Sequence, residues 1–142
     1  MVFVNHYEHS LDAKGRIVLP AKFRHQLGEK VFLGPLDGSL GVYSEAAYME
    51  LAHRLQDQVR NGELDPMVRR GFAAMTVEVE LDNAGRITIP SRLREFAQLI
   101  DDVVVNGAFD YIEIWNRPAF EAMRSELNAA VLEQFKDGGT IN

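Results

Sequence analysis

A carboxylate, a glycine and an arginine recur at fixed spacing in the two halves of this chain. Residues 11–20 and residues 81–90 both follow the pattern L-D-x-x-G-R-[apolar]-x-[apolar]-P. In D-x-x-G-R the aspartate can start a tight turn by accepting a backbone N–H, and the glycine supplies the left-handed residue that closes it. The same aspartate can hold the guanidinium in one orientation, with its remaining N–H donors facing outward. A guanidinium presented in this way suits bidentate recognition of a guanine edge or a phosphate.

The motif also has a plainer interpretation. An exposed Asp–Arg pair beside a turn contributes roughly 0 to 1 kcal/mol to stability and needs no ligand. For one isolated copy that interpretation is favoured. Two copies in register, each followed by further basic residues, favour a duplicated module whose turn uses its positive charge for binding.

Basic side chains continue beyond each motif, and they are candidate phosphate contacts: Lys22, Arg24, Arg92 and Arg94. Residues 12–24 therefore carry a net charge of +3 and residues 82–94 one of +2, in a chain of net charge −6. The negative total argues against a nucleic-acid-binding surface over the whole molecule, but the positive charge is concentrated at the repeat. Each of these four cations is either a phosphate contact or a solvated helix residue, and the sequence leaves both alternatives open.

The elements that must position the turns follow from the same pattern. Each half is predicted to form a hairpin around its turn, a short helix opened by Pro20 or Pro90, and two further strands. Residues 77–81 alternate apolar and polar side chains and indicate the clearest half-buried strand. In each hairpin, Asp and Arg are expected as cross-strand neighbours on the polar face, opposite the apolar residues of the core. A half of about 45 residues is near the lower limit at which a chain without disulfides or metal folds alone, so each half is expected to need a partner, and the other half is the obvious one.

Three longer helices are predicted around the second half of the repeat. Ser44 caps the first, and residues 65–66, an Asp-Pro pair, open a shorter second one. The third follows Asn116 and ends before the glycine pair at 138–139. Apolar stripes along the first and third helices serve either core packing or contacts between subunits, and the sequence leaves both open.

Several classes of function lack the residues that they need. The 142 residues include no cysteine, which excludes disulfides and thiolate chemistry. His6 and His9 form a His-x-x-His pair, but on a strand that spacing points the rings to opposite faces, and no metal site is predicted. Without a phosphate-binding loop, a G-x-S-x-G motif or a dinucleotide fingerprint, no enzyme, cofactor or small-molecule substrate is predicted. No signal peptide or membrane-length apolar segment is predicted either, so a cytoplasmic protein is expected.

The two motifs, their spacing and their coverage of nearly the whole chain resemble the MraZ family, bacterial proteins with two AbrB-like (SpoVT-AbrB) DNA-binding modules. The resemblance implies a mainly β fold with α-helices: a duplicated swapped-hairpin β-barrel with pseudo-twofold symmetry, plus amphipathic linker and C-terminal helices. Several protomers are then expected to close into a ring. The expected division is module 1 over residues 5–47, a helical linker over 48–75, module 2 over 76–119, and a C-terminal helix and tail over 120–142.

The resemblance also implies a sequence-specific transcriptional regulator. Such a protein, associated with the nucleoid, binds short repeats in double-stranded DNA upstream of its own operon of division and cell-wall genes, with repression as the favoured direction. The family's D-x-x-x-R signature falls on Asp12 and Arg16 and again on Asp82 and Arg86. Arg16 and Arg86 are the predicted readers of base or phosphate, Asp12 and Asp82 their orienting partners, Gly15 and Gly85 the turn formers, and Lys14 an added phosphate contact.

Two alternatives stay open: Asp12 and Asp82 either orient the arginines or serve turn geometry alone, and a second function competes with DNA binding. Lys14 is matched by Ala84 in the second turn, so the two turns are expected to contribute unequally. The rival function is a ring-forming scaffold that binds another protein without reading DNA. That rival does not explain why both turns place an arginine next to the glycine, and replacing Arg16 and Arg86 would leave its activity intact.

Overall fold

The computed structural model describes residues 2–136, which form strands and helices in mixed order. The strands are β1 (His6–Ser10), β2 (Arg16–Val18), β3 (Lys30–Pro35), β4 (Leu40–Ser44), β5 (Val77–Glu80), β6 (Arg86–Thr88), β7 (Asp102–Gly107) and β8 (Ile112–Asn116). The helices are α1 (Ala21–Leu27), α2 (Glu45–Arg60), α3 (Pro66–Met75), α4 (Ser91–Phe96) and α5 (Arg117–Lys136). The order strand, strand, helix, strand, strand occurs in both halves, as the repeat predicts.

The strands pair into two antiparallel sheets. Six of them form one sheet in the order β1-β7-β8-β4-β3-β5, while β2 and β6 pair only with each other among the described residues. The duplicated set of elements is as expected, but the molecule is a mixed fold of sheet and helix and not the mainly β fold that the resemblance implied, because the linker and C-terminal helices are long. Its described strands pair as an open six-stranded sheet and a separate two-stranded sheet, and no ladder closes them into one barrel.

The expectation that the strands on either side of each turn form a hairpin ladder is wrong. β1 pairs along its whole length with β7 of the other half, from His6 opposite Asn106 to Ser10 opposite Asp102. In the same way, β5 pairs with β3 of the first half. The physical reason is burial: the partner in the other half belongs to a long buried sheet, whereas β2 and β6 are only three residues long.

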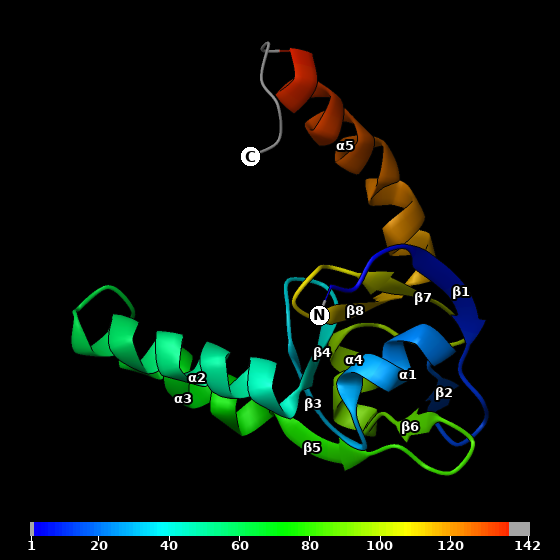
Figure 1. Ribbon diagram of the computed structural model, residues 1–142, viewed down its shortest axis with the longest axis horizontal. Helices are drawn as coiled ribbons and strands as arrows, with labels where there is room; N and C mark the ends of the chain where they lie inside the picture. The colour runs from blue at the N-terminus through cyan, green and yellow to red at the C-terminus, as the bar shows by residue number, and fades with distance from the viewer. Residues whose placement is uncertain (1, 137–142) are drawn as a thin grey trace.

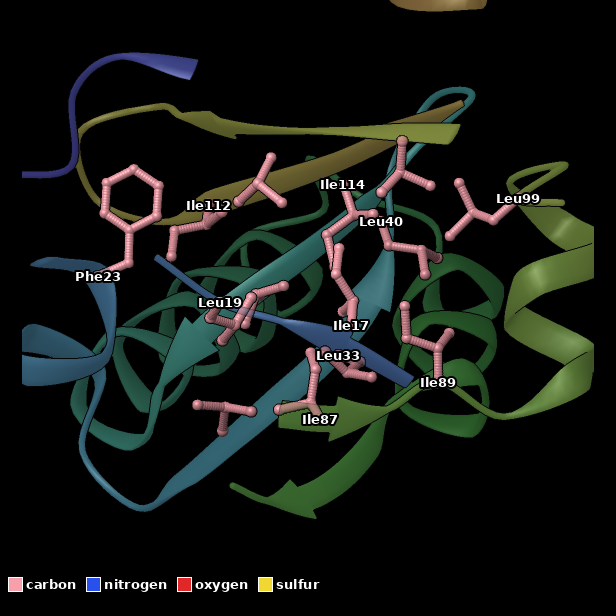
Figure 2. Close-up of a cluster of buried hydrophobic side chains, with 14 of the residues drawn as sticks. Ile17, Leu19, Phe23, Leu33, Leu40, Ile87, Ile89, Leu99, Ile112 and Ile114 are labelled. Atoms are coloured by element: carbon pink, nitrogen blue, oxygen red, sulfur yellow. The ribbon is translucent and has the colours of Figure 1, made fainter. Parts of the chain in front are cut away.

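One hydrophobic core lies between the two sheets and takes side chains from both halves (Figure 2). The apolar residues of the repeated motif enter it as predicted, because Ile17 and Ile87 stand opposite each other in the β2–β6 ladder and are fully buried. Further buried residues come from the large sheet: Val31, Leu33, Leu40, Val42, Val103, Val105, Ile112 and Ile114. Neither half encloses a core of its own, so each needs the other to fold.

The predicted caps start α2 and α3. The Ser44 side chain accepts a hydrogen bond from the N–H of Ala47 at 3.2 Å, and the Asp65 side chain accepts one from the N–H of Met67 at 2.9 Å. Together the two helices form an arm that projects from one side of the sheets (Figure 1). Tyr48 of α2 packs the arm against the six-stranded sheet by stacking on Phe32 of β3, with ring centroids 4.6 Å apart. The short helices α1 and α4 follow Pro20 and Pro90 as predicted.

The third predicted helix, α5, contacts the sheets through its base, residues 117–124. Phe120 is buried there and packs against Trp115 with ring centroids 6.2 Å apart, while Arg117 forms an ion pair with Glu8. Beyond this base the helix projects away from both sheets (Figure 1). Four apolar side chains of its outer part are exposed: Leu127, Val131, Leu132 and Phe135. Core packing therefore accounts for the start of the stripe and not for its end; the glycine pair at 138–139 lies outside the described residues.

Candidate nucleic-acid interface

The first motif folds into a tight turn that its own aspartate closes. The N–H of Asp12 donates to the carbonyl of Arg16 at 3.0 Å, and the N–H of Gly15 donates to the carbonyl of Asp12 at 3.0 Å. Oδ1 of Asp12 accepts the N–H groups of Lys14 and Arg16, both at 2.9 Å. Gly15 has φ +75°, in the left-handed region where glycine is favoured. The predicted roles of the aspartate and the glycine in forming the turn agree with this geometry.

The second motif repeats the same turn. Oδ1 of Asp82 accepts the N–H groups of Ala84 and Arg86, both at 2.9 Å, and Gly85 has φ +76°. The N–H of Gly85 donates to the carbonyl of Asp82 at 2.9 Å, and the N–H of Asp82 donates to the carbonyl of Arg86 at 2.9 Å. The pattern of buried and exposed residues is also identical over residues 11–20 and 81–90. Two equivalent turns are therefore built from different side chains at the middle positions.

Each turn presents a guanidinium that is held from one side only. Nε of Arg16 donates to Oδ2 of Asp12 at 2.7 Å, and Nε of Arg86 donates to Oδ2 of Asp82 at the same distance. Within residues 2–136 neither arginine uses its terminal Nη atoms in a hydrogen bond to protein. Both side chains stay partly exposed, at 28% for Arg16 and 32% for Arg86. The Nη donors are thus oriented and open to an incoming acceptor.

The electrostatics of each turn keep the aspartate charged. The backbone N–H of Arg16, and after it the guanidinium and the N–H of Lys14, hold the pKa of Asp12 below its usual value. The N–H of Arg86 lowers the pKa of Asp82 by the same mechanism. An ionised carboxylate accepts all the N–H donors around it, which fixes the arginine side chain and the loop together.

The β2–β6 ladder joins the two turns into one rigid block. Arg16 stands opposite Thr88, and Arg86 stands opposite Val18. Two crossed backbone bonds extend the ladder into the turns, because the N–H of Leu19 donates to Gly85 at 3.0 Å and the N–H of Ile89 donates to Gly15 at 2.9 Å. Both guanidinium groups therefore belong to neighbouring strands of one two-stranded sheet.

The four downstream cations fall into two classes. Lys22 and Arg92 are exposed on α1 and α4, whereas Arg24 and Arg94 on the same helices are half-buried. Arg94 lies against Gly15 of the first turn, and Arg24 lies against Gly85 of the second. Sequence reasoning left all four as one group. Spacing could not have separated them, because both pairs recur at the same distance from the motif arginine; the one difference in the sequence is that positions 24 and 94 are both arginine, whereas positions 22 and 92 are lysine and arginine.

Lys14 is the one charged residue by which the middle positions of the two turns differ. The Lys14 side chain is exposed in the first turn beside Arg16, and the matching position of the second turn is the uncharged Ala84.

Among residues 2–136, no three His, Asp or Glu side chains gather in a way that could hold a metal ion. No helix in that part of the chain has the length and apolar character to cross a membrane.

Comparison with known proteins gives one consistent result. The sequence matches the family described as "MraZ protein, putative antitoxin-like" twice, over residues 2–69 and 72–137. A protein of Thermoanaerobacter sp. (strain X514), named "Transcriptional regulator MraZ", is 40% identical over 121 residues, which are 84% of this chain and 85% of that protein. A protein of the same name from Acetivibrio thermocellus is 38% identical over 128 residues, or 89% of this chain and 90% of that protein. A third, from Halothermothrix orenii, is 41% identical over 117 residues, or 81% of each.

Proposed function

Since this chain belongs to the MraZ family, we propose that it is a transcriptional regulator that binds double-stranded DNA through its two turns. The observation that carries this proposal is the shared geometry of the two Asp–Arg pairs. Each carboxylate holds its arginine at Nε and leaves the Nη donors open, on two neighbouring strands of one sheet. The relatives named as transcriptional regulators support the same conclusion.

The roles of the residues follow from their places in the turns. Arg16 and Arg86 contact base edges or phosphates, Asp12 and Asp82 orient them, and Gly15 and Gly85 form the turns. Lys14 adds a phosphate contact that the second turn lacks. Lys22 and Arg92, exposed on the helices that follow each turn, are further phosphate contacts. This is recognition chemistry, so we propose a binding protein and no enzymatic activity, cofactor or small-molecule substrate.

We further propose the setting in which this binding acts. The target is a set of short repeats upstream of the protein's own operon of division and cell-wall genes, the effect is repression, and the protein is cytoplasmic and associated with the nucleoid. The protomers form a closed homo-oligomer, a ring, and the exposed apolar residues of α5 support contacts between subunits. Repeated DNA favours such an assembly, because linked reading heads raise avidity without new contacts.

The domain division is part of the same proposal. Residues 5–47 and 76–119 are the two AbrB-like modules, residues 48–75 the helical linker, and residues 120–142 the C-terminal helix and tail. The exchange of first strands between halves supports descent from a swapped-hairpin barrel, because β1 and β5 each complete the sheet of the opposite module.

The decisive experiment measures binding to the DNA just upstream of the protein's own gene. Wild type is compared with Arg16→Ala/Arg86→Ala over a salt series, with scrambled DNA as the sequence control. Arg60→Ala/Arg70→Ala removes the same charge from exposed positions on the arm and serves as the matched control variant. We expect tight, salt-dependent binding by wild type and the control, and loss of binding by the folded turn variant, at about 1 to 3 kcal/mol per base contact.

Two results would overturn the proposal. Equal binding by wild type and the turn variant would remove Arg16 and Arg86 from the interface. Absence of binding by any of the proteins would favour a scaffold that contacts another protein.

A further inference from the structure

We propose that Arg24 and Arg94 are positioning residues that act across the two halves, each fixing the turn of the opposite module. Arg94 of the second half holds the first turn, and Arg24 of the first half holds the second. This role rests on the proposed DNA binding, because it concerns how Arg16 and Arg86 are presented. It differs from phosphate contact, in which the two guanidinium groups would face DNA.

The Arg94 side chain contacts the rest of the protein on two sides. Its Nε donates to the carbonyl of Ile89 at 3.0 Å. Its guanidinium lies flat against the first turn, because a methyl group added to Gly15 would come within 2.7 Å of Cζ and 2.8 Å of Nε. The N–H of Ile89 in turn donates to the carbonyl of Gly15 at 2.9 Å. Arg94, Ile89 and Gly15 thus form a closed set of contacts that ties the first turn to α4.

The Arg24 side chain covers the second turn in a similar arrangement. Its Nη1 donates to the carbonyl of Ala84 in the second turn at 3.4 Å, near the upper limit for a hydrogen bond. A methyl group added to Gly85 would overlap the Arg24 guanidinium. The N–H of Leu19 donates to the carbonyl of Gly85 at 3.0 Å. The second turn is therefore covered in the same way, with the difference that Arg24 donates to the turn itself, whereas Arg94 donates to Ile89, whose own N–H bonds to the first turn.

Both turn positions require glycine for a second reason besides backbone conformation. A Cβ atom at Gly15 or Gly85 would collide with the arginine of the opposite half. Both glycines are buried although their neighbours in the turn are exposed, and the opposite arginine is what covers them. Lys22 and Arg92, two residues earlier on the same helices, are exposed. Each short helix therefore places one cation in solvent and one on the opposite turn, so Lys22 and Arg92 are matched controls for Arg24 and Arg94.

The first test needs no DNA. Backbone amide NMR shifts are compared between wild type, Arg94→Ala and Arg24→Ala, with Arg92→Ala and Lys22→Ala as controls. We expect Arg94→Ala to move the amides of residues 14–16 and to leave those of residues 84–86 in place, and Arg24→Ala to do the reverse. Shifts confined to the turn of the substituted arginine's own half, or equal in both turns, would overturn the proposal.

The second test separates positioning from phosphate contact. Arg94→Lys keeps the positive charge and loses the flat guanidinium on Gly15 with its Nε donor, and it also serves if the alanine variant fails to fold. We expect roughly three- to tenfold weaker DNA binding, which corresponds to the loss of about one hydrogen bond. The slope of the logarithm of the binding constant against the logarithm of salt concentration should stay unchanged, because no phosphate contact is lost. Binding by Arg94→Lys equal to wild type, together with a reduced salt slope for Arg94→Ala, would show a phosphate contact instead.

A double-mutant cycle gives the crossed relation directly. The effect of Arg94→Lys on DNA binding should be lost when Arg16 is already alanine, and should persist when Arg86 is alanine. The opposite dependence, or full additivity with both, would contradict the proposal. If wild type binds no DNA, the proposed function fails, whereas the crossed NMR pattern still decides whether the two arginines position the turns.

Discussion

At the scale of single residues, two features favour glycine at position 85: its left-handed backbone conformation and the close approach of Arg24. Their costs in free energy of unfolding can be measured separately. Gly62 has nearly the same backbone conformation, φ +75° against +76°, but a methyl group added there meets nothing within 4 Å. Gly62→Ala should therefore lower the free energy of unfolding by only the cost of a left-handed alanine, about 1 to 2 kcal/mol. Gly85→Ala should cost more, because Arg24 must also move. Urea denaturation of both variants checks this, and equal losses would contradict it.

The two turn aspartates make the stability of the turns depend on pH. Their pKa values are lowered in the folded protein, so their contribution is fully present above the unfolded pKa of about 4. It is lost as the pH falls from there through the lower folded pKa. Asp12→Asn/Asp82→Asn should thus be less stable than wild type at pH 7, with a difference that shrinks in the acid range below pH ~4.

Thermal unfolding between pH 3 and pH 7 measures this difference. Asp57→Asn, which changes an exposed pair with Arg60 on the arm, is the control for removing a surface carboxylate. A constant gap between wild type and the turn variant at all pH values would show that the carboxylate charge does not act in the turn.

Much of the turn geometry could be predicted from the residue types alone. An aspartate three residues before a glycine and four before an arginine has few other ways to satisfy its oxygens, and the structure shows the predicted contacts in both copies. The contacts of Arg24 and Arg94 could not be predicted in this way. They depend on which turn each short helix faces, and the sequence around a helix does not carry that information.

At the scale of elements, a substitution at Gly71 of α3 tests whether another molecule packs against the exposed face of the arm. It lies in the middle of α3, is exposed, and an added methyl group meets nothing within 4 Å. Gly71→Ala should raise the free energy of unfolding by up to about 1 kcal/mol, the difference in helix propensity. Met67 and Val68, one turn earlier on the same face, are also exposed. Chemical denaturation checks the sign, and a destabilised variant would indicate that another molecule packs on this face in solution.

The predicted elements and the predicted pairings differ in how they could be inferred. Caps and prolines are local signals, and they placed the starts of α2 and α3 where the structure has them. Strand pairing is a distant relation. The alternation of apolar and polar residues in β5 is the same whether its partner is β6 or β3, because both pairings bury the same face. The sequence pattern therefore supported a hairpin equally well.

At the scale of the whole molecule, the shared core predicts one cooperative unfolding transition. Ile17→Ala and Ile87→Ala should each lower the free energy of unfolding by about 2 to 5 kcal/mol. Trp115, the single tryptophan, lies in β8 of the second half and reports on that half by fluorescence. Ile17→Ala in the first half should shift the Trp115 transition and the circular dichroism transition equally. A tryptophan transition unchanged from wild type would show that the halves unfold separately.

The exposed end of α5 predicts the behaviour of the assembly. Val131 and Phe135 are 50% and 53% exposed, one helical turn apart, and they make no contribution to the core. Val131→Glu/Phe135→Glu should reduce the mass measured by light scattering and leave the thermal stability of the protomer body nearly unchanged. Glu133→Gln on the same helix is the control. An unchanged mass in the double variant would place the subunit contacts elsewhere.

The pairing of β1 with β7 also determines when the protein can fold during its synthesis. The strand of His6 has no partner until Asn106, 100 residues later, has been synthesised, whereas β3 can pair with β4 directly after it. At about 5 to 20 residues per second, a nascent chain carries its first strand unpaired for about 5 to 20 seconds. The first turn consequently becomes rigid only after the second module has left the ribosome. We therefore expect a chain cut short before β7 to lack the partner of β1 and part of the shared core, so that its turns are not held as in the full chain.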